Sequence, residues 1–230
     1  MANKKKVIVT GFEPFGEHAV NSSWVAVREL ERLGLDEAVD LYVCEVPVEY
    51  QAVQSLLPSL WEQHLPQMAP DDAQAILVGQ FYSKRQKLVV HVGVSGLATT
   101  VTLEQCGHNK GYKRPDNCRF CPASQCCMED GPDCISSLLD MDTVCERVND
   151  SNVGVAVSVS KDAGRYLCDY TYYSSLFLGH GRCAFIHVPP LGKPYSSQQL
   201  GRALQAVVRE MLTLLEVANT EEEEQCKHSH

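Results

Sequence analysis

The sequence predicts an α/β fold: a three-layer α/β/α sandwich with a mixed, mostly parallel sheet. Short apolar runs rich in β-branched residues alternate along the chain with segments of helical periodicity. The strand-like runs are continuously apolar, which is typical of a sheet buried on both faces. The 230 residues can bury a sizeable core, and they contain no internal repeat and no clear linker. We therefore expect a single domain over residues 1–218.

The first half of the chain has helix signals between four expected strands. Asn21 can cap a helix over 22–33, and Gly34 ends it. A second helix is expected over about 49–64, interrupted near Pro58. The four expected strands lie at 6–12, 39–46, 88–94 and 99–106.

The second half begins with a segment that has no periodicity. Residues 107–135 are rich in Gly, Pro, Asn and Cys, so we expect an ordered loop there, a cysteine-rich excursion. Ser196 and Gln199 resemble a capping box that opens a final helix running to about 217. The acidic tail, 219–230, has no apolar face and is expected to be disordered. Between the excursion and the final helix we expect a helix near 141–149, a strand at 153–160, a helix from about Cys168 and a strand at 183–189.

Composition narrows the possible partners and compartment. The net charge of −9 disfavours nucleic acid or an anionic membrane as the main partner, because both would be repelled. No segment approaches the roughly 20 apolar residues that span a bilayer. The N-terminal run "VIVTGF" ends at Glu13, so it does not resemble a secretory signal. Eleven cysteines, an odd number, fit reduced thiols better than a disulfide framework, so we expect a cytoplasmic protein.

Three ionisable residues fall where strands end or loops begin. Cys168 follows a tight turn and precedes a helical segment, and a helix N-terminus favours the thiolate. His187 ends the strand "CAFIH", and Glu104 lies near the end of "TTVTLE". A thiolate, an imidazole and an orienting carboxylate form a coherent set for acyl transfer. The ordinary alternatives are a buried thiol, a structural histidine and a surface glutamate, and periodicity alone does not exclude them.

Four stretches of sequence carry a resemblance to a known family. They are "VTGFEPFGEHAVNSSW", "HVGVSGLATTVTLEQCGHN", "SKDAGRYLCDYTYY" and "FIHVPPLGKPY". In them the chain resembles the pyroglutamyl-peptidase I family of cysteine peptidases, most closely its vertebrate form. The resemblance implies a phosphorylase/hydrolase-like fold, no cofactor and no metal requirement. It also implies peptides with N-terminal pyroglutamate as substrates, and we expect a monomer or small homo-oligomer.

The resemblance assigns roles to these residues by motif. Cys168 becomes the nucleophile, His187 the general base and acid, and Glu104 the carboxylate partner. Substrate selection should rest on an apolar slot for the uncharged lactam ring, because burying a free glutamate's charges is costly. The residues that the resemblance and the neighbouring sequence suggest for this slot are Phe12, Phe15, Val48, Tyr166 and Leu167.

Two departures from the family pattern stand out. Bacterial members have an arginine in the turn before the glutamate, where this chain has Ala98, so backbone N–H groups near Cys168 would have to stabilise the oxyanion. The vertebrate pattern also runs from "LWEQHLPQ" directly into "LVVHVGV", whereas this chain interposes residues 68–87. This insertion is either a tolerated surface loop or an alternatively spliced or mispredicted segment that weakens folding.

Other classes of function remain open from the sequence. The cysteine-rich excursion includes a C-x-x-C pair and further ligand-type residues, which allows a zinc-stabilised interaction module or a catalytically inactive relative. A nucleoside phosphorylase would share the fold class, although no phosphate or ribose site is evident. The candidate zinc ligands are Cys106, His108, Cys118, Cys121, Cys126 and Cys127.

Overall fold

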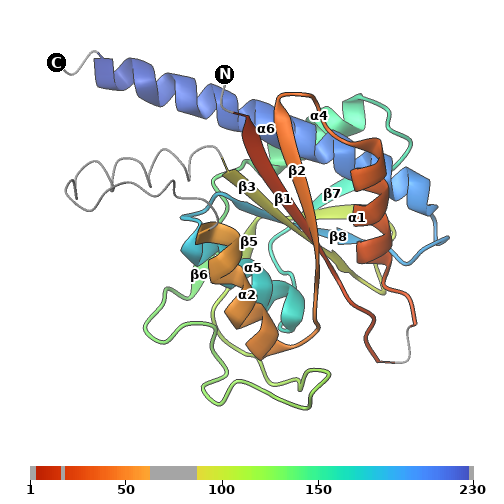
Figure 1. Cartoon of the computed structure of the whole chain (residues 1–230), viewed down its shortest axis with the longest axis vertical. Coiled ribbons are helices and arrows are strands. Elements are labelled where there is room, and N and C mark those ends of the chain that lie inside the picture. The colour runs from red at the N-terminus through yellow and green to blue at the C-terminus, as the bar shows by residue number, and fades with distance from the viewer. Residues whose placement is uncertain (1–3, 17–18, 63–86, 228–230) are drawn as a thin grey trace.

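The computed structural model describes residues 4–16, 19–62 and 87–227, with the side chains of the last helix described to residue 218. In the described part of the chain, one six-stranded sheet has the order β2-β1-β3-β8-β4-β7 (Figure 1). Only the β4–β8 pair in this sheet is antiparallel. The predicted mixed, mostly parallel sheet is confirmed. The strands are β1 (Lys5–Phe12), β2 (Val39–Val46), β3 (Lys87–Val94), β4 (Val101–Glu104), β7 (Val157–Ser160) and β8 (Cys183–Val188).

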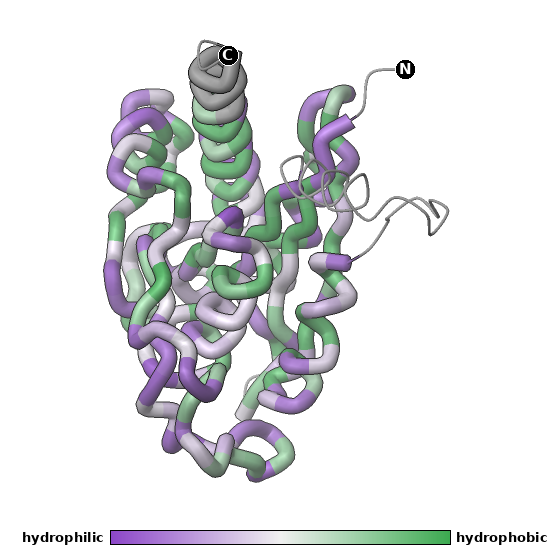
Figure 2. Tube along the Cα trace, turned by 90° about the vertical axis from the view of Figure 1, so that its left-hand side faces the viewer, coloured by the Kyte–Doolittle hydropathy of each residue, from purple (hydrophilic) through white to green (hydrophobic). Residues whose placement is uncertain are grey.

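Helices cover both faces of the sheet, as a three-layer sandwich requires. One core lies under α1 (Ser22–Leu33), α4 (Met141–Asp150) and α6 (Ser197–Lys227). The second core lies under α2 (Tyr50–Glu62) and α5 (Leu167–Leu178). Successive strand residues contribute to alternate cores, because side chains alternate across a strand. Hydrophobic residues recur turn after turn along α6, the helix that spans one face (Figure 2).

The predicted helix caps are confirmed. The Asn21 side chain accepts a bond from the N–H of Ser23 at 3.0 Å, and the N–H of Gly34 closes α1. Ser196 and Gln199 exchange side-chain bonds to each other's N–H groups at 3.0 and 3.3 Å, which is the expected capping box.

Two helices differ from the prediction. Pro58 does not interrupt α2, which is continuous from Tyr50 to Glu62. Buried residues on either side of the proline, such as Val53 and Trp61, hold the helix against the sheet and outweigh the lost hydrogen bond. The prediction that residues 219–230 are disordered is wrong as far as Lys227, because α6 continues to that residue. Glutamate, glutamine and lysine are good helix formers even without an apolar face.

The predicted strand at 99–106 is two strands. β4 ends at Glu104, and β5 (Cys106–His108) leaves the sheet to pair with β6 (Cys134–Ser136), which was not predicted. Gln105 fixes this bend, since its side chain bonds the carbonyls of Ser137 and Leu139. The strand predicted at 153–160 is also shorter, beginning at Val157, because Gly154 has a φ of +77°.

The interposed segment 68–87 lies outside the described residues except for its last residue. Lys87 is the first residue of β3, paired with Lys6 and 5% exposed, so the strand begins one residue inside the predicted insertion. Among the residues that the structure describes, no helix is both long and apolar enough to cross a membrane.

Candidate active site

Cys168 is the second residue of α5, at the helix N-terminus predicted from the sequence. The turn before it contains Gly164, whose φ of +82° favours glycine. Tyr166 is the N-cap residue, and its side chain makes no capping hydrogen bond. The first N–H groups of α5 therefore have no side-chain cap, and the positive end of the helix dipole lies at the thiol.

His187 and Glu104 meet on adjacent antiparallel strands. In the β4–β8 register Glu104 pairs with Phe185, and Thr102 pairs with His187. His187 Nδ1 lies 2.8 Å from Glu104 Oε1, and both residues are buried. The carboxylate thus fixes the orientation of the ring and leaves Nε2 for chemistry.

Cys168 and His187 also interact through their side chains. Burial alone would lower the pKa of His187, but Cys168 and then Glu104 outweigh burial and raise it to about 10. The structure therefore brings the three predicted catalytic residues together as a chain, from thiol to imidazole to carboxylate. By contrast, burial raises the pKa of the Cys106, Cys127 and Cys183 thiols to about 12, so these three stay neutral near pH 7.

Gly93 makes room for the thiol. It lies opposite His187 in the parallel β3–β8 register. A Cβ atom at this position would be 2.8 Å from Cys168 Sγ and 2.8 Å from Phe185 Cζ. Only glycine leaves the space in which the Cys168 thiol reaches the sheet.

A small cavity opens beside Cys168. The open space there is about 280 Å³, which includes solvent outside the molecule. All five residues that were predicted for the substrate slot line it, together with Asn21 and Val94. Among the described residues that line it there is no lysine, arginine, aspartate or glutamate, so this part of the cavity suits a small uncharged group. The lining residues are Phe12, Phe15, Asn21, Val48, Val94, Tyr166, Leu167 and Cys168.

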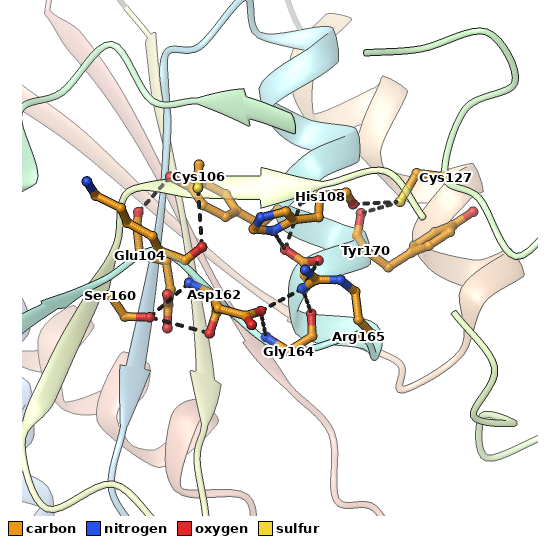
Figure 3. A network of polar contacts seen from close by, with 12 residues as sticks. Glu104, Cys106, His108, Cys127, Ser160, Asp162, Gly164, Arg165 and Tyr170 are labelled. Atoms are coloured by element: carbon orange, nitrogen blue, oxygen red, sulfur yellow. Dashed lines mark hydrogen bonds and ion pairs between the residues drawn. The ribbon is translucent and has the colours of Figure 1, made fainter. Parts of the chain in front are cut away.

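Asp169 connects the start of α5 to the neighbouring segments through hydrogen bonds. Its buried carboxylate accepts bonds from the His108 N–H at 3.2 Å, Tyr112 Oη at 3.0 Å and Arg165 Nη1 at 3.2 Å. Arg165 also bonds Asp162 and the Gly164 carbonyl in the turn that leads into α5 (Figure 3). The carboxylate therefore joins β5, the excursion and the turn to the start of α5.

The cysteine-rich excursion packs behind the pocket wall and does not form a separate module. Asp116 accepts a bond from the Tyr50 N–H at the start of α2, and the Tyr166 hydroxyl bonds the Pro115 carbonyl. Arg114 stacks over the Tyr166 ring at 4.2 Å. Tyr166 lines the cavity, so the excursion supports its position from outside.

The six candidate zinc ligands do not gather into one site. Within the described residues, the group close enough to share an ion is Cys106, His108 and Cys134. Cys121 and Cys126 instead donate to backbone carbonyls of Tyr112 and Ser124. Cys134 was not among the sequence candidates, because its approach to Cys106 depends on the unpredicted β6.

Sequence reasoning missed Gly93, Asn21, Val94 and Asp169 at the site. Asn21 was identified only as a helix cap, and Gly93 only as part of a strand. The one available signal was for Asp169, an acidic residue directly after Cys168 in an otherwise apolar helix segment. A strand glycine carries a weaker signal of close approach.

Comparisons with known proteins point to one family. A family model described as pyroglutamyl peptidase matches residues 5–81 and 60–218. Pyroglutamyl-peptidase 1 of Rattus norvegicus is 63% identical over 215 residues, which covers 94% of this chain and 93% of the relative. Pyroglutamyl-peptidase 1-like protein of Homo sapiens is 41% identical over 80% of this chain and 84% of its own.

Solved structures show the same fold. The pyrrolidone carboxyl peptidase from Thermococcus litoralis superposes with a TM-score of 0.74 at 21% identity, over 93% of this chain and 96% of that one. The pyroglutamyl peptidase I from Bacillus amyloliquefaciens gives a TM-score of 0.68 at 23% identity, over 89% and 95%.

Proposed function

The chain belongs to the pyroglutamyl peptidase family, and we propose that it removes N-terminal pyroglutamate from peptides as a cysteine-type omega peptidase. One observation carries the proposal. The side chains of Cys168, His187 and Glu104 interact in that order, and Cys168 lines a small cavity that has no charged side chain among its described lining residues. A zinc-stabilised interaction module or a nucleoside phosphorylase would not need this arrangement.

In the first half-reaction Cys168 attacks the carbonyl carbon that joins pyroglutamate to the next residue. Because Cys168 and Glu104 raise the pKa of His187 to about 10, the imidazole holds a proton near neutral pH, and in the proposed step Cys168 attacks as the thiolate. The thiolate forms the C–S bond, and the carbonyl electrons move to oxygen. As the C–N bond breaks, His187 gives its proton to the departing amine and leaves a thioester on Cys168.

In the second half-reaction water hydrolyses the thioester. Neutral His187 takes a proton from the water, and the hydroxide adds to the thioester carbonyl. Collapse expels the Cys168 thiolate and releases pyroglutamate, while His187 keeps the proton and restores the starting pair. Glu104 holds the ring in one orientation through both steps and favours its charged form.

Backbone N–H groups at the start of α5 are the proposed oxyanion donors. Ala98 occupies the position of the bacterial arginine and has no side-chain donor, while its own N–H bonds the Ser95 carbonyl. The N–H groups in the first turn of α5 have no side-chain cap and lie beside the thiol. Oriented backbone donors stabilise developing negative charge without reorganisation.

The cavity explains selection of the lactam ring. Phe12, Phe15 and Val48 supply apolar walls, and the polar atoms of Asn21 are already bonded to Glu13 and Ser23. A flat, uncharged ring therefore buries no charge there, whereas an N-terminal glutamate would bury an ammonium and a carboxylate without partners. Discrimination thus rests on charge as well as on shape.

The chemistry also suggests a setting for the enzyme. Cys168 must stay reduced to act, which fits the cytoplasm. The net charge of −9 gives no attraction to nucleic acid or an anionic membrane, so we propose soluble peptides as the partners. We retain the expectation of a monomer or small homo-oligomer.

The test uses a fluorogenic pyroglutamyl amide and a prolyl amide that lacks the lactam carbonyl. The wild-type chain should hydrolyse the first and not the second, and Cys168→Ala should abolish hydrolysis. Cys168→Ser is the matched control, because it keeps the shape but supplies a weaker nucleophile. Hydrolysis that survives Cys168→Ala would overturn the nucleophile assignment, and an inactive, folded wild-type chain would overturn the proposed activity.

A further inference from the structure

Two thiols and an imidazole come together beside the active site but outside it. β5 and β6 pair so that His108 lies opposite Cys134 and Cys106 lies opposite Ser136. Cys106 and His108 are two residues apart on β5, so their side chains lie on the same face of the strand. One ligand atom from each of Cys106, His108 and Cys134 lies within 4.8 Å of the other two. Figure 3 shows Cys106 and His108 on β5, beyond Glu104 at the end of β4.

We propose that Cys106 Sγ, Cys134 Sγ and the His108 imidazole bind a Zn²⁺ ion. Two thiolates and one imidazole are ligands that zinc prefers. Tetrahedral geometry with Zn–S bonds of about 2.3 Å places sulfur atoms roughly 3.8 Å apart, so the two sulfur atoms need to approach by no more than about 1 Å. Cys134 is exposed, so the ion has a route of entry and a fourth position for water.

The surroundings of His108 match the second shell of a zinc site. A zinc-bound histidine commonly donates its other ring N–H to a carboxylate. His108 Nδ1 lies 3.7 Å from Asp169 Oδ1, and this buried nitrogen has no hydrogen bond to any described residue.

The site shares no ligand with the catalytic residues. Zinc would displace the two thiol protons to solvent and would join the short strands β5 and β6. It would not take part in thioester chemistry, so the inference does not depend on the proposed peptidase activity. Its location, two residues after Glu104 and against the Asp169 carboxylate, is nevertheless close enough for bound metal to influence the active site.

The experiment titrates Co²⁺, a spectroscopic substitute for Zn²⁺, into metal-free Cys168→Ala protein under a reductant that does not bind metal. The background substitution removes the catalytic thiol as a ligand. We expect one equivalent of Co²⁺ to give a thiolate-to-cobalt charge-transfer band, and Zn²⁺ to displace it. Cys134→Ser should halve the intensity of this band and lower the affinity at least about tenfold, since even second-shell changes cost that much.

Two further variants make the result specific. Cys118→Ser removes another exposed thiol of the same excursion and should leave the titration unchanged. His108→Ala should keep the charge-transfer intensity at saturation, because both thiolates remain, but should weaken binding at least about tenfold. Absence of the band in the parent protein would overturn the proposal. A band whose intensity and affinity stay unchanged in both Cys134→Ser and His108→Ala would also overturn the proposal. This holds equally for a band that Cys118→Ser removes.

Discussion

Gly93 and His187 lie opposite each other on parallel strands β3 and β8, and the thiol of Cys168 sits where a side chain at position 93 would begin. Cys168 comes from a helix on one face of the sheet, and His187 comes from the sheet itself. The two can meet only if the neighbouring strand has no side chain between them. A single backbone position therefore decides whether the helix and the strands form one active site.

Substituting Gly93 with alanine should disable the enzyme while preserving the fold. The new Cβ would lie 2.8 Å from both Cys168 Sγ and Phe185 Cζ, so the thiol or the ring must move. A displacement of about 1 Å at a reacting atom can cost roughly 100-fold in rate. We expect kcat/KM to fall by about that factor, measured with the pyroglutamyl amide.

Gly96→Ala is the matched control for this substitution. Gly96 lies in the turn after β3, and a Cβ there would meet nothing within 4 Å. This variant should retain activity close to that of the wild-type chain. Wild-type kcat/KM in Gly93→Ala would show that the thiol does not need the space.

Glu104→Gln should lower activity and shift its dependence on pH. The glutamine keeps the shape but loses the charge that helps to raise the pKa of His187 to about 10. We expect kcat to fall about 10²–10⁴-fold, the range for losing an acid–base partner's orientation. The alkaline limb of the wild-type profile should lie near pH 10, where His187 loses its proton, and it should move to lower pH in the variant.

The raised pKa of His187 also affects the stability of the protein. The folded-state pKa of His187 is above its ordinary 6.5, so its stabilising contribution is complete below about pH 6.5 and is lost as pH rises through about 10. Unfolding free energies at pH 6.5, 8 and 10 should therefore fall less steeply in Glu104→Gln than in the wild type. NMR titration of the imidazole provides the control: an unchanged His187 pKa in both Glu104→Gln and Cys168→Ala would contradict the assigned cause.

Local sequence signals were sufficient for much of this fold. Asn21, Gly34 and the Ser196–Gln199 box act within one or two turns of chain, so the helix ends that they set could be predicted. The continuously apolar strands likewise predicted a sheet buried on both faces. The break at Gln105 could not be found in this way, because it depends on carbonyls of Ser137 and Leu139 more than 30 residues along the chain.

The active site likewise contains residues that local sequence predicts and residues that it does not. Cys168, His187 and Glu104 have chemically distinctive side chains at strand or helix ends, so residue type and position were enough to select them. Gly93 acts through an absent side chain, and its importance depends on what faces it across the sheet. The grouping of Cys106 with Cys134 follows from the β5–β6 register, which a segment without periodicity does not reveal.

Asp169→Ala should strongly destabilise the protein. Its carboxylate is fully buried and accepts bonds from the His108 N–H, Tyr112 and Arg165. Removing it leaves the His108 N–H without its acceptor and leaves Arg165 with Asp162 as its carboxylate partner, and breaking a buried ion pair costs about 3–5 kcal/mol. Tyr112→Phe removes one neutral hydroxyl from the same network and should cost only about 1 kcal/mol. Urea unfolding of both variants measures the difference, and equal losses would contradict the central role of the carboxylate.

Deleting residues 68–86 should leave activity equal to that of the full chain or raise it. Every residue of the site described above comes from outside this stretch, and residues 63–67 would remain to link α2 to β3, a length common for such connections. Lys87 must be kept, because it is buried in β3 and its ammonium group bonds the Leu60 carbonyl.

A second deletion, of residues 118–126 in the excursion, is the contrasting control for the first. It removes the Phe120 ring that contacts Tyr50 and the bridge between Lys110 and Cys126, so the wall behind Tyr166 loses its support. We expect kcat/KM for the pyroglutamyl amide to survive the first deletion and to fall sharply in the second. Loss of activity on deleting 68–86, with the protein still folded by circular dichroism, would mean that the interposed segment contributes to the working site.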